Sequence, residues 1–376
     1  MVTLIDENDY ANAMQGTVIP ALAACATEGW MEPATHPGLT VLGEPYESHD
    51  GKLHYLTYSY AKFPKANREA DAPNEARGTI VIAHGFTEFC QRYDEIAYYF
   101  LAHGYSVAIM EDRGHGYSPR DLEDFDRVWI DDWRRYVVDL KKFCEAVARP
   151  LEPGRPLCMY AHSMGGGIAV ALAEQYPSTL DALVLSAPMI DAVFGPPEKI
   201  TPAIIDTLCL GHGDQAPAPG QTTFPSWSED LVTPGLSMAR GKWLYDLRAD
   251  DAHYQNFEAT NGWVREMIRL SKSIRRQSAI GRITTPILLL QSADDVEVVL
   301  PAQDKFVLDV REAGGVASLV RLEDAPHEQG SLPNVLLKEV MRESLSFFDT
   351  YTEPAPWETR NDIAEIDDAE IDDAQK

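Results

Sequence analysis

The chain of 376 residues has little positive charge, because 32 Lys and Arg stand against 59 Asp and Glu, for a net charge of −27. Binding to a phosphate backbone requires a basic surface, so this composition argues against a nucleic-acid partner. No apolar run reaches the roughly 18 residues that a membrane-spanning helix needs. The rest of the composition, 45% apolar and 24% charged, is that of an ordinary globular protein with enough apolar residues for a large core.

Cysteine is also scarce, with five residues, no CxxC pair and no spacing typical of metal ligands. In a chain of this length the pattern predicts free, buried thiols in a reducing compartment, and we expect a cytoplasmic location. Residues 22–25 resemble a bacterial lipobox. However, the first fifteen residues hold no Lys or Arg, and Pro20 interrupts the apolar stretch, so lipid anchoring at Cys25 is disfavoured. We expect instead an amphipathic N-terminal helix with Cys25 packed inward.

Short apolar runs alternate with longer segments of helical periodicity, a pattern typical of βαβ units and a mostly parallel sheet. Strands are predicted at residues 53–60, 78–83, 105–110, 157–162, 180–186, 286–291 and 317–322. Helices are predicted at residues 93–103, 130–148, 164–175, 302–313 and 336–348. The alternation stops between residues 187 and 280, where no parallel-strand pattern occurs and two helix-like segments lie near 237–248 and 262–278. This proline-rich stretch is interpreted as an excursion from the sheet.

These patterns divide the chain into four parts. We predict an N-terminal helical extension (1–40), an α/β core (41–187 and 283–351), a cap (188–282) and an acidic tail (352–376). The tail repeats Ala-Glu-Ile-Asp-Asp and holds nine acids against two bases. Such a segment repels itself and buries too little apolar surface to fold, so we predict a disordered tail without a catalytic role.

The strongest chemical signal is the segment 159–167, in which a predicted strand ends at His162 and a helix follows Ser163 directly. A serine on so sharp a turn projects its Oγ above the sheet edge, and small residues are needed two positions before and after it. Ala161 and Gly165 meet that need. The pattern indicates a nucleophile, whereas the alternative is an incidental serine at a Gly-rich helix start.

A serine nucleophile needs a histidine base and a carboxylate that orients the base. In doubly wound hydrolases these groups follow the serine in the order acid, then histidine. His327 follows the last predicted strand, and Asp294 and Asp295 follow the strand before it. All three groups therefore occur in the required order at carboxyl ends of strands. His327 alone would be interpreted as a surface loop residue, but the joint placement is more specific than any single motif.

An oxyanion site is predicted where the strand at 78–83 ends in His84-Gly85-Phe86 and the backbone turns. The backbone N–H groups of Phe86 and Met164 are the expected donors. Loss of one such donor costs ~2.7–4 kcal/mol of barrier. No GxGxxG opens a helix and no ligand cluster indicates a metal, so neither a cofactor nor a metal is predicted.

At these motifs the chain resembles the α/β-hydrolases, in the branch of lysophospholipases and monoacylglycerol lipases. The segments that carry the resemblance are His84-Gly-Phe, Asp112-Arg-Gly-His-Gly-Tyr-Ser118, Ala161-His-Ser-Met-Gly-Gly166, Ala187-Pro-Met, Thr285-Pro-Ile-Leu-Leu-Leu-Gln291 and Ala325-Pro-His-Glu328. Residues 262–266 are similar to the bacterial lysophospholipase L2 type. The resemblance covers about residues 40–350.

This resemblance implies the α/β-hydrolase fold, a mostly parallel doubly wound sheet with a helical cap inserted after the sixth strand. It implies a serine esterase of single-chain acyl lipids, with Ser163, Asp295 and His327 as catalytic triad and no cofactor. It favours Asp295 over Asp294, because the family places the acid four residues after the glutamine that stands here at position 291. The oligomeric state is not indicated.

Two alternatives stay open. A serine peptidase of the proline-iminopeptidase type, in the S33 group, shares the fold and triad. It would need cap carboxylates to hold the substrate amine, for which Glu258 and Glu266 are candidates. A non-catalytic binding module on a hydrolase scaffold is the other alternative.

The last cap helix sorts its residues into two faces. Trp263, Met267, Leu270 and Ile274 follow helical spacing and predict a buried face. A basic stripe is formed on the opposite face by residues with the same spacing, two positions later along the chain: Arg265, Arg269, Lys272 and Arg276. Such a stripe is either a solvated face or a surface that meets an anionic membrane, with Arg265 and Arg269 binding the substrate head group.

Overall fold

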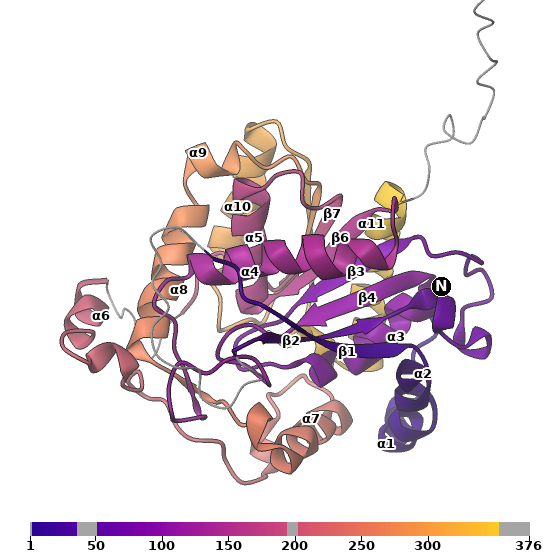
Figure 1. Ribbon diagram of the computed structural model, residues 1–376, viewed down its shortest axis with the longest axis horizontal. Coiled ribbons are helices and arrows are strands. Elements are labelled where there is room, and N and C mark those ends of the chain that lie inside the picture. The colour runs from indigo at the N-terminus through magenta and orange to yellow at the C-terminus, as the bar shows by residue number, and fades with distance from the viewer. Residues whose placement is uncertain (1, 36–50, 194–201, 353–376) are drawn as a thin grey trace, which may run out of the picture.

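The computed structural model describes residues 2–35, 51–193 and 202–352. At its centre is an eight-stranded sheet in the order β1-β2-β4-β3-β6-β7-β9-β10 (Figure 1). β1 and β2 are antiparallel to their neighbours, and all the other pairs are parallel. The strands are β1 (Ala26–Met31), β2 (Leu53–Tyr58), β3 (Gly78–Ala83), β4 (Tyr105–Met110), β6 (Leu157–His162), β7 (Ala182–Ser186), β9 (Ile287–Ser292) and β10 (Ala317–Leu322). The predicted mostly parallel sheet is confirmed.

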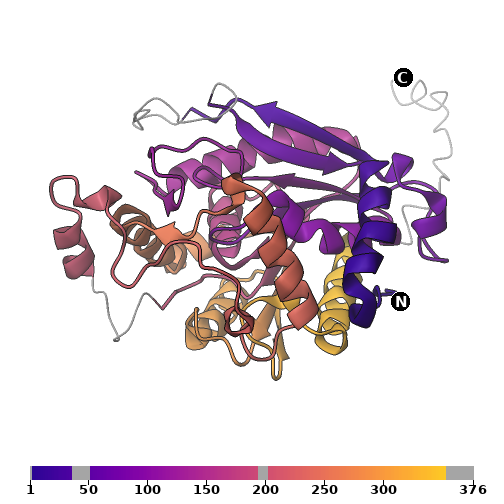
Figure 2. The ribbon, with the colours of Figure 1, turned by 90° about the horizontal axis from the view of Figure 1, so that it is seen from below.

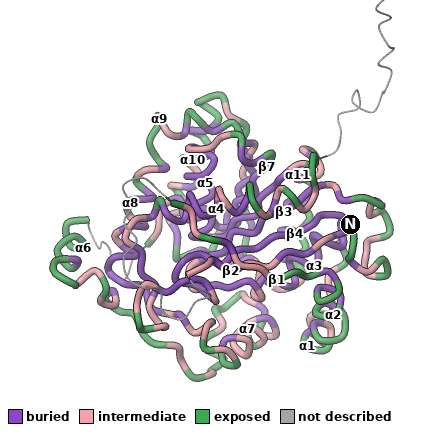
Figure 3. Tube along the Cα trace, viewed as in Figure 1, coloured by how far each residue is buried: buried purple, intermediate pink, exposed green. Residues whose placement is uncertain are grey.

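Helices cover both faces of this sheet. The five central strands are buried along their whole length (Figure 3), which explains their continuous apolar runs. One apolar core lies under α4, α5 and α10, and a second lies under α3 and α11. These helices are α3 (Asp94–His103), α4 (Arg134–Phe143), α5 (Ser163–Gln175), α10 (Leu300–Glu312) and α11 (Asn334–Thr352). The doubly wound arrangement is therefore confirmed as well.

The N-terminal segment departs from the purely helical extension that we expected. Helices α1 (Tyr10–Ala13) and α2 (Ile19–Ala23) are joined by a π-helix, and Cys25 is buried as predicted. The chain then forms β1, which no pattern predicted, because this edge strand is mostly exposed and lacks apolar alternation. Gly29 in β1 lies under the Tyr55 ring, where an added Cβ would come within 2.3 Å of the ring atoms.

Between β7 and β9 the chain leaves the sheet and forms a cap, which follows the sixth strand of the main sheet in chain order. Its helices are α6 (Pro202–Leu208), α7 (Met238–Asp250), α8 (Asn261–Ile274) and α9 (Gln277–Ile280). α8 packs on α5 through the predicted apolar face, whereas α6 is largely exposed (Figure 3). The expectation that this region holds no parallel strand is wrong, because the short β8 (Glu258–Ala259) pairs in parallel with β5 (Arg127–Val128).

The other long cap helix, α7, lies beside the N-terminal helices (Figure 2). Arg240 of α7 is almost fully buried and forms a two-pronged ion pair with Glu95 of α3, at 2.6 and 2.8 Å. Its guanidinium also lies over the ring of Tyr10 and 3.6 Å from Glu7. The N-terminal segment therefore helps to fix one wall of the cap.

Within the three described ranges, no helix is long and apolar enough to cross a bilayer. The predicted disordered tail begins at residue 352, and residues 353–376 lie outside the described part of the chain.

Candidate active site

The predicted nucleophile lies on the turn between β6 and α5. Ser163 has a φ of 50°, a left-handed conformation that few non-glycine residues adopt. The turn also brings the start of α5 against β3, where a Cβ on Gly165 would lie 2.4 Å from the carbonyl oxygen of Ala83. Glycine is therefore required two positions after the serine. The conformation raises the Ser163 side chain above the carboxyl edge of the sheet.

A continuous hydrogen-bond chain joins the three residues that the sequence singled out. The Oγ of Ser163 lies 2.8 Å from Nε2 of His327, and Nδ1 of the same ring lies 2.6 Å from Oδ2 of Asp295. Because an ionised carboxylate can only accept, Nδ1 carries the proton and Nε2 is left to accept from the serine hydroxyl in the neutral ring. The arrangement can therefore remove a proton from Ser163.

The two neighbouring aspartates have different surroundings. The Asp295 side chain is fully buried, and its Oδ1 accepts hydrogen bonds from the backbone N–H groups of Glu297 and Val298. Asp294 is exposed and makes only a backbone hydrogen bond, to Ala325. The structure thus brings Asp295, and not Asp294, to His327.

The loop after β3 is held by two side chains. His84 Nε2 accepts from the backbone N–H of Asp112, so its Nδ1 donates to the carbonyl oxygen of Gly85. The carboxylate of Glu88 accepts from the Gly85 N–H. In the described part of the chain, the N–H groups of Phe86 and Met164 make no hydrogen bond. Both residues line a cavity that Ser163 also lines, so their donors are available to a ligand there.

A buried charge network, which we did not predict, lies behind the histidine. The guanidinium of Arg92 bridges the carboxylates of Glu88 and Glu328, and Glu328 also lies 3.4 Å from Nε2 of His162. Burial alone would raise the pKa of both carboxyls, but the charge of Arg92 outweighs it and holds both pKa values below the ordinary value. These residues come from three separate segments, and only Glu88 and Arg92, four residues apart, have a local spacing, so the sequence could not have signalled the whole network.

The base itself has a shifted pKa. Burial lowers the pKa of His327, but its hydrogen bond to Asp295 and the charges of Glu297 and Glu328 outweigh burial and raise the pKa to about 9. The Glu297 carboxylate lies 3.8 Å from Nε2 and is more than half exposed. The histidine must lose a proton before it can accept one from Ser163, so the shift favours activity at alkaline pH.

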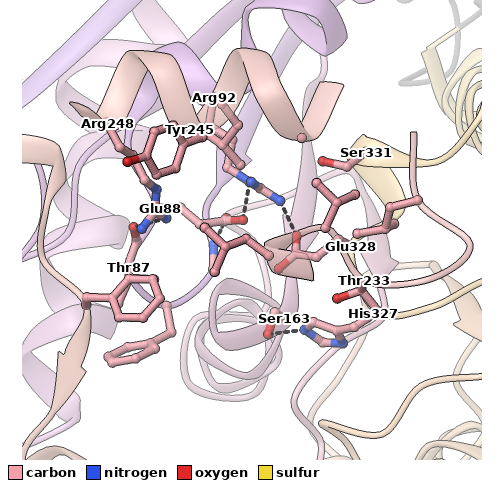
Figure 4. Close-up of a pocket in the computed structure, with 18 of the residues that line it drawn as sticks. Thr87, Glu88, Arg92, Ser163, Thr233, Tyr245, Arg248, His327, Glu328 and Ser331 are labelled. Carbon is pink, nitrogen blue, oxygen red and sulfur yellow. Dashed lines mark hydrogen bonds and ion pairs between the residues drawn. The ribbon is translucent and has the colours of Figure 1, made fainter. Parts of the chain in front are cut away.

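Two cavities meet at the serine. The larger, of about 420 Å³, contains the charged side chains Glu88, Arg92, Arg248 and Glu328 (Figure 4). Its outer wall is aromatic and aliphatic and includes Phe224, Trp227, Leu231, Leu244, Tyr245 and Phe257. The smaller, of about 230 Å³, is mainly apolar and is lined by residues that include Met164, Met189, Ala218, Trp263 and Val298. A ligand with a scissile bond at Ser163 could extend into both.

Several predicted cap residues lie outside these cavities. Arg265 and Arg269 both pair with the buried carboxylate of Glu266, at 3.2 and 2.7 Å, and neither lines either cavity. The predicted head-group role of these arginines therefore has no support from the geometry. Glu266 is occupied by that pairing and Glu258 by Arg127, so neither carboxylate is placed to hold a substrate amine.

Two clusters in the described segments have metal-binding residue types. His162, His327 and Glu328 belong to the site above. In the other, both ring nitrogens of His54 are bonded to carboxylates, of Glu111 and Glu28, and burial raises the pKa of the Cys90 thiol well above its ordinary value. A protonated thiol and an ion-paired imidazole are poor metal ligands.

Comparison with known proteins identifies a family and several relatives that this chain matches. The family described as "Serine aminopeptidase, S33" (Hydrolase_4) matches residues 74–328. A lysophospholipase L2 of Escherichia coli (strain K12) is 29% identical over 248 residues, which are 63% of this chain and 68% of the relative. A monoacylglycerol lipase of Mycolicibacterium smegmatis is 34% identical over 228 residues, which are 59% of this chain and 71% of the relative.

Solved structures agree on the architecture. A soluble variant of monoglyceride lipase from Saccharomyces cerevisiae, in complex with a substrate analog, superposes with a TM-score of 0.62 at 20% identity. The match covers 85% of this chain and all of that one. The fold is therefore the α/β-hydrolase fold, as the sequence predicted.

Proposed function

We propose that this chain, which belongs to the serine aminopeptidase S33 family of α/β-hydrolases, hydrolyses the ester bond of single-chain acyl lipids. The relatives reported above, a lysophospholipase and a monoacylglycerol lipase, support this proposal. The substrates would be lysophospholipids or monoacylglycerols. The observation that carries the proposal is the hydrogen-bond chain Ser163–His327–Asp295 at the junction of two cavities. One cavity offers apolar walls to an acyl chain, and the other offers buried charges to a polar group.

In the proposed mechanism, Ser163 attacks the ester carbonyl while Nε2 of His327 takes its proton. Asp295 holds the imidazole in the productive tautomer and stabilises its charged form. The N–H groups of Phe86 and Met164 donate to the oxyanion of the tetrahedral intermediate. His327 then gives the proton to the leaving alcohol, and the same base activates water against the acyl-enzyme.

The first experiment tests whether the serine is reactive. A fluorophosphonate probe should label the wild-type protein at Ser163 and leave the Ser163→Ala variant unlabelled. That variant should also lose activity by a factor on the order of 10⁶ in kcat. A folded wild-type protein that takes up no label would instead favour the non-catalytic binding module.

The second experiment identifies the substrate class. A panel of lysophosphatidylcholine, monoolein, p-nitrophenyl esters of graded chain length and proline-β-naphthylamide separates lipase, short-chain esterase and peptidase. We expect turnover of the two lipids and the longer esters. Preferential cleavage of the naphthylamide would overturn the proposal in favour of the peptidase alternative.

A further inference from the structure

Arg248, near the end of α7, differs from most of the other buried arginines in the described part of the chain. Arg92, Arg113, Arg135 and Arg240 each lie within ion-pair distance of a carboxylate. Arg248 is only 8% exposed, and in the described part of the chain no carboxylate lies within ion-pair distance of it. Burying a charge without a counter-charge is costly, so this position needs an explanation.

The known contacts of Arg248 leave most of its donors unused. Its Nη2 donates one hydrogen bond, of 2.7 Å, to the carbonyl oxygen of Thr87. The rings of Phe89 and Phe257 lie about 6 Å from the guanidinium carbon. A guanidinium carries five N–H donors in a flat fork that matches a phosphate or carboxylate group.

The two acidic residues nearest in the network are already occupied. Glu88 is bonded to Arg92, Tyr93 and the Gly85 N–H, and Glu328 is bonded to Arg92 and His162. Burial and the nearby charge of Arg92 lower the pKa of Arg248 to about 10, so it remains a cation at neutral pH. Arg120 also lacks a carboxylate, and its Nε and Nη1 have no hydrogen-bond partner. Its Nη2 donates to the carbonyl oxygens of Gly116 and His253, and the residue lines neither cavity, so no ligand in either cavity can reach it.

The position of Arg248 relative to the reacting centre is also informative. It lines the larger cavity together with Ser163, and Figure 4 shows its side chain entering from α7 beside Thr87 and Glu88. Thr87 directly follows Phe86, one of the two expected oxyanion donors. An anion bound to Arg248 would therefore lie close to the ester carbonyl. In a lysophospholipid, the phosphate is likewise close to the ester, because only the three-carbon glycerol separates them.

We propose that Arg248 binds the head-group phosphate of a lysophospholipid, and so makes the larger cavity the head-group site and the smaller cavity the acyl site. This rests on the proposed function and names the substrate class within it. A monoacylglycerol has no anion to offer Arg248, so binding it leaves the buried cation uncompensated. The enzyme would therefore prefer the phospholipid.

The test compares a lysophosphatidylglycerol with a monoacylglycerol that carries the same acyl chain. The chain is short enough for both to dissolve as monomers, so that the surface charge of micelles plays no part. The measured quantity is the ratio of the two kcat/KM values at fixed ionic strength. Because hydrogen bonds between charged groups are among the stronger ones, Arg248→Gln should lower this ratio about tenfold to a hundredfold, mainly through KM, and Arg248→Lys should lower it less.

The matched control is Leu244→Ala, which alters the same cavity one helical turn earlier without changing charge. It should change both substrates alike and leave the ratio unaltered. Equal losses on both substrates in Arg248→Gln would overturn the proposal, because they would mean that Arg248 only fixes the strained Thr87, whose φ is 58°. Thermal unfolding of each variant checks that the fold is kept.

A second arm uses sn-glycerol 3-phosphate and inorganic phosphate as inhibitors of a short p-nitrophenyl ester. Glycerol phosphate should inhibit the wild-type enzyme and lose that effect in Arg248→Gln. If the free phosphates inhibit through Arg248 while the lipid ratio is unchanged, the site binds a free phosphate and the lipid proposal is wrong. If the fluorophosphonate does not label Ser163, the proposed function fails, whereas a labelled enzyme with an unchanged ratio and unchanged inhibition refutes only the role of Arg248.

Discussion

The edge of the sheet and the cap hold their functional side chains in different ways. At the sheet edge, Ser163 follows β6 directly, and Asp295 and His327 lie in the loops just after β9 and β10. Backbone geometry positions Ser163, and hydrogen bonds from backbone N–H groups position Asp295. In the cap, α7 is held by a few side-chain contacts, above all the ion pair of Arg240 with Glu95. We therefore expect the chemistry to depend on the sheet edge, and the choice of substrate to depend on a cap in which α7 is held largely by side-chain contacts.

The largest expected effect tests the rigid side of this comparison. Asp295→Asn should lower kcat by about 10⁴-fold on every substrate, as a wrong histidine tautomer does in a related triad. Asp294→Asn should have a mild effect, because this exposed side chain makes no contact with His327. Steady-state kinetics on a short p-nitrophenyl ester measures both. A crippling effect of Asp294→Asn would show that the acid has been assigned to the wrong residue.

A second prediction concerns the anchor of the cap. Arg240→Met leaves Glu95 buried without its partner, so the free energy of unfolding should fall by about 3–5 kcal/mol, and amide exchange in α7 should become faster. The KM for a lysophospholipid should rise more than the KM for a short p-nitrophenyl ester, since only the former places a head group against the wall that α7 contributes to the larger cavity.

The control for this anchor removes both charges. The double variant Arg240→Met with Glu95→Gln should recover part of the lost stability, because no buried charge is left unpaired. Denaturant unfolding of the three variants measures the recovery. If the single variant instead lowered kcat equally on the lysophospholipid and the short ester, the separation between sheet edge and cap would not hold.

The smallest effect is expected at Glu297, which lies between the two parts. Glu297→Gln removes a charge that raises the pKa of His327, so the acid limb of the pH profile of kcat/KM should move from about 9 to lower pH. Because the carboxylate is exposed, the shift should be about 0.5–1 pH unit, the size expected from roughly 1 kcal/mol at 4 Å in water. Asp294→Asn, in the same loop, should leave the limb unmoved.

Stability should change with pH in the opposite direction. The pKa of His327 in the folded state lies above its ordinary value of 6.5. Protonation of His327 therefore contributes to the free energy of unfolding, and this contribution is fully present below pH 6.5. This contribution is lost as the pH rises through about 9. Wild-type unfolding free energies between pH 6 and 10 should therefore fall where activity rises, and Glu297→Gln should reduce both trends.

The sequence was sufficient where local patterns determine structure. The strands at 78–83, 105–110 and 157–162 have the predicted bounds, because buried parallel strands need continuous apolar runs. The partly exposed strand at 317–322 also has the predicted bounds. The turn at Ser163 and the strand ends before Asp295 and His327 follow from the same logic. The structure brings together Ser163, Asp295 and His327, the three residues that the sequence had singled out.

The sequence was insufficient where partners come from distant segments. β1 is an exposed edge strand without alternation, and its place depends on pairing with β2. The larger cavity draws its charges from the loop after β3, from α7 and from the segment after β10. A single arginine such as Arg248 has no periodicity, so only its burial without a carboxylate distinguishes it from a surface residue.

The contacts of Arg240 also bear on the order in which the molecule is assembled. Its partners include Glu7 near the start of the chain, Glu95 in α3, and Asn334 at the start of α11. Such contacts between distant segments form late, because long loops must close first. During synthesis, the full set of Arg240 contacts can therefore form only after residue 334 has been made, long after Ser163. The contacts that fix α7 as a wall of the larger cavity are thus complete only after the nucleophile has been made.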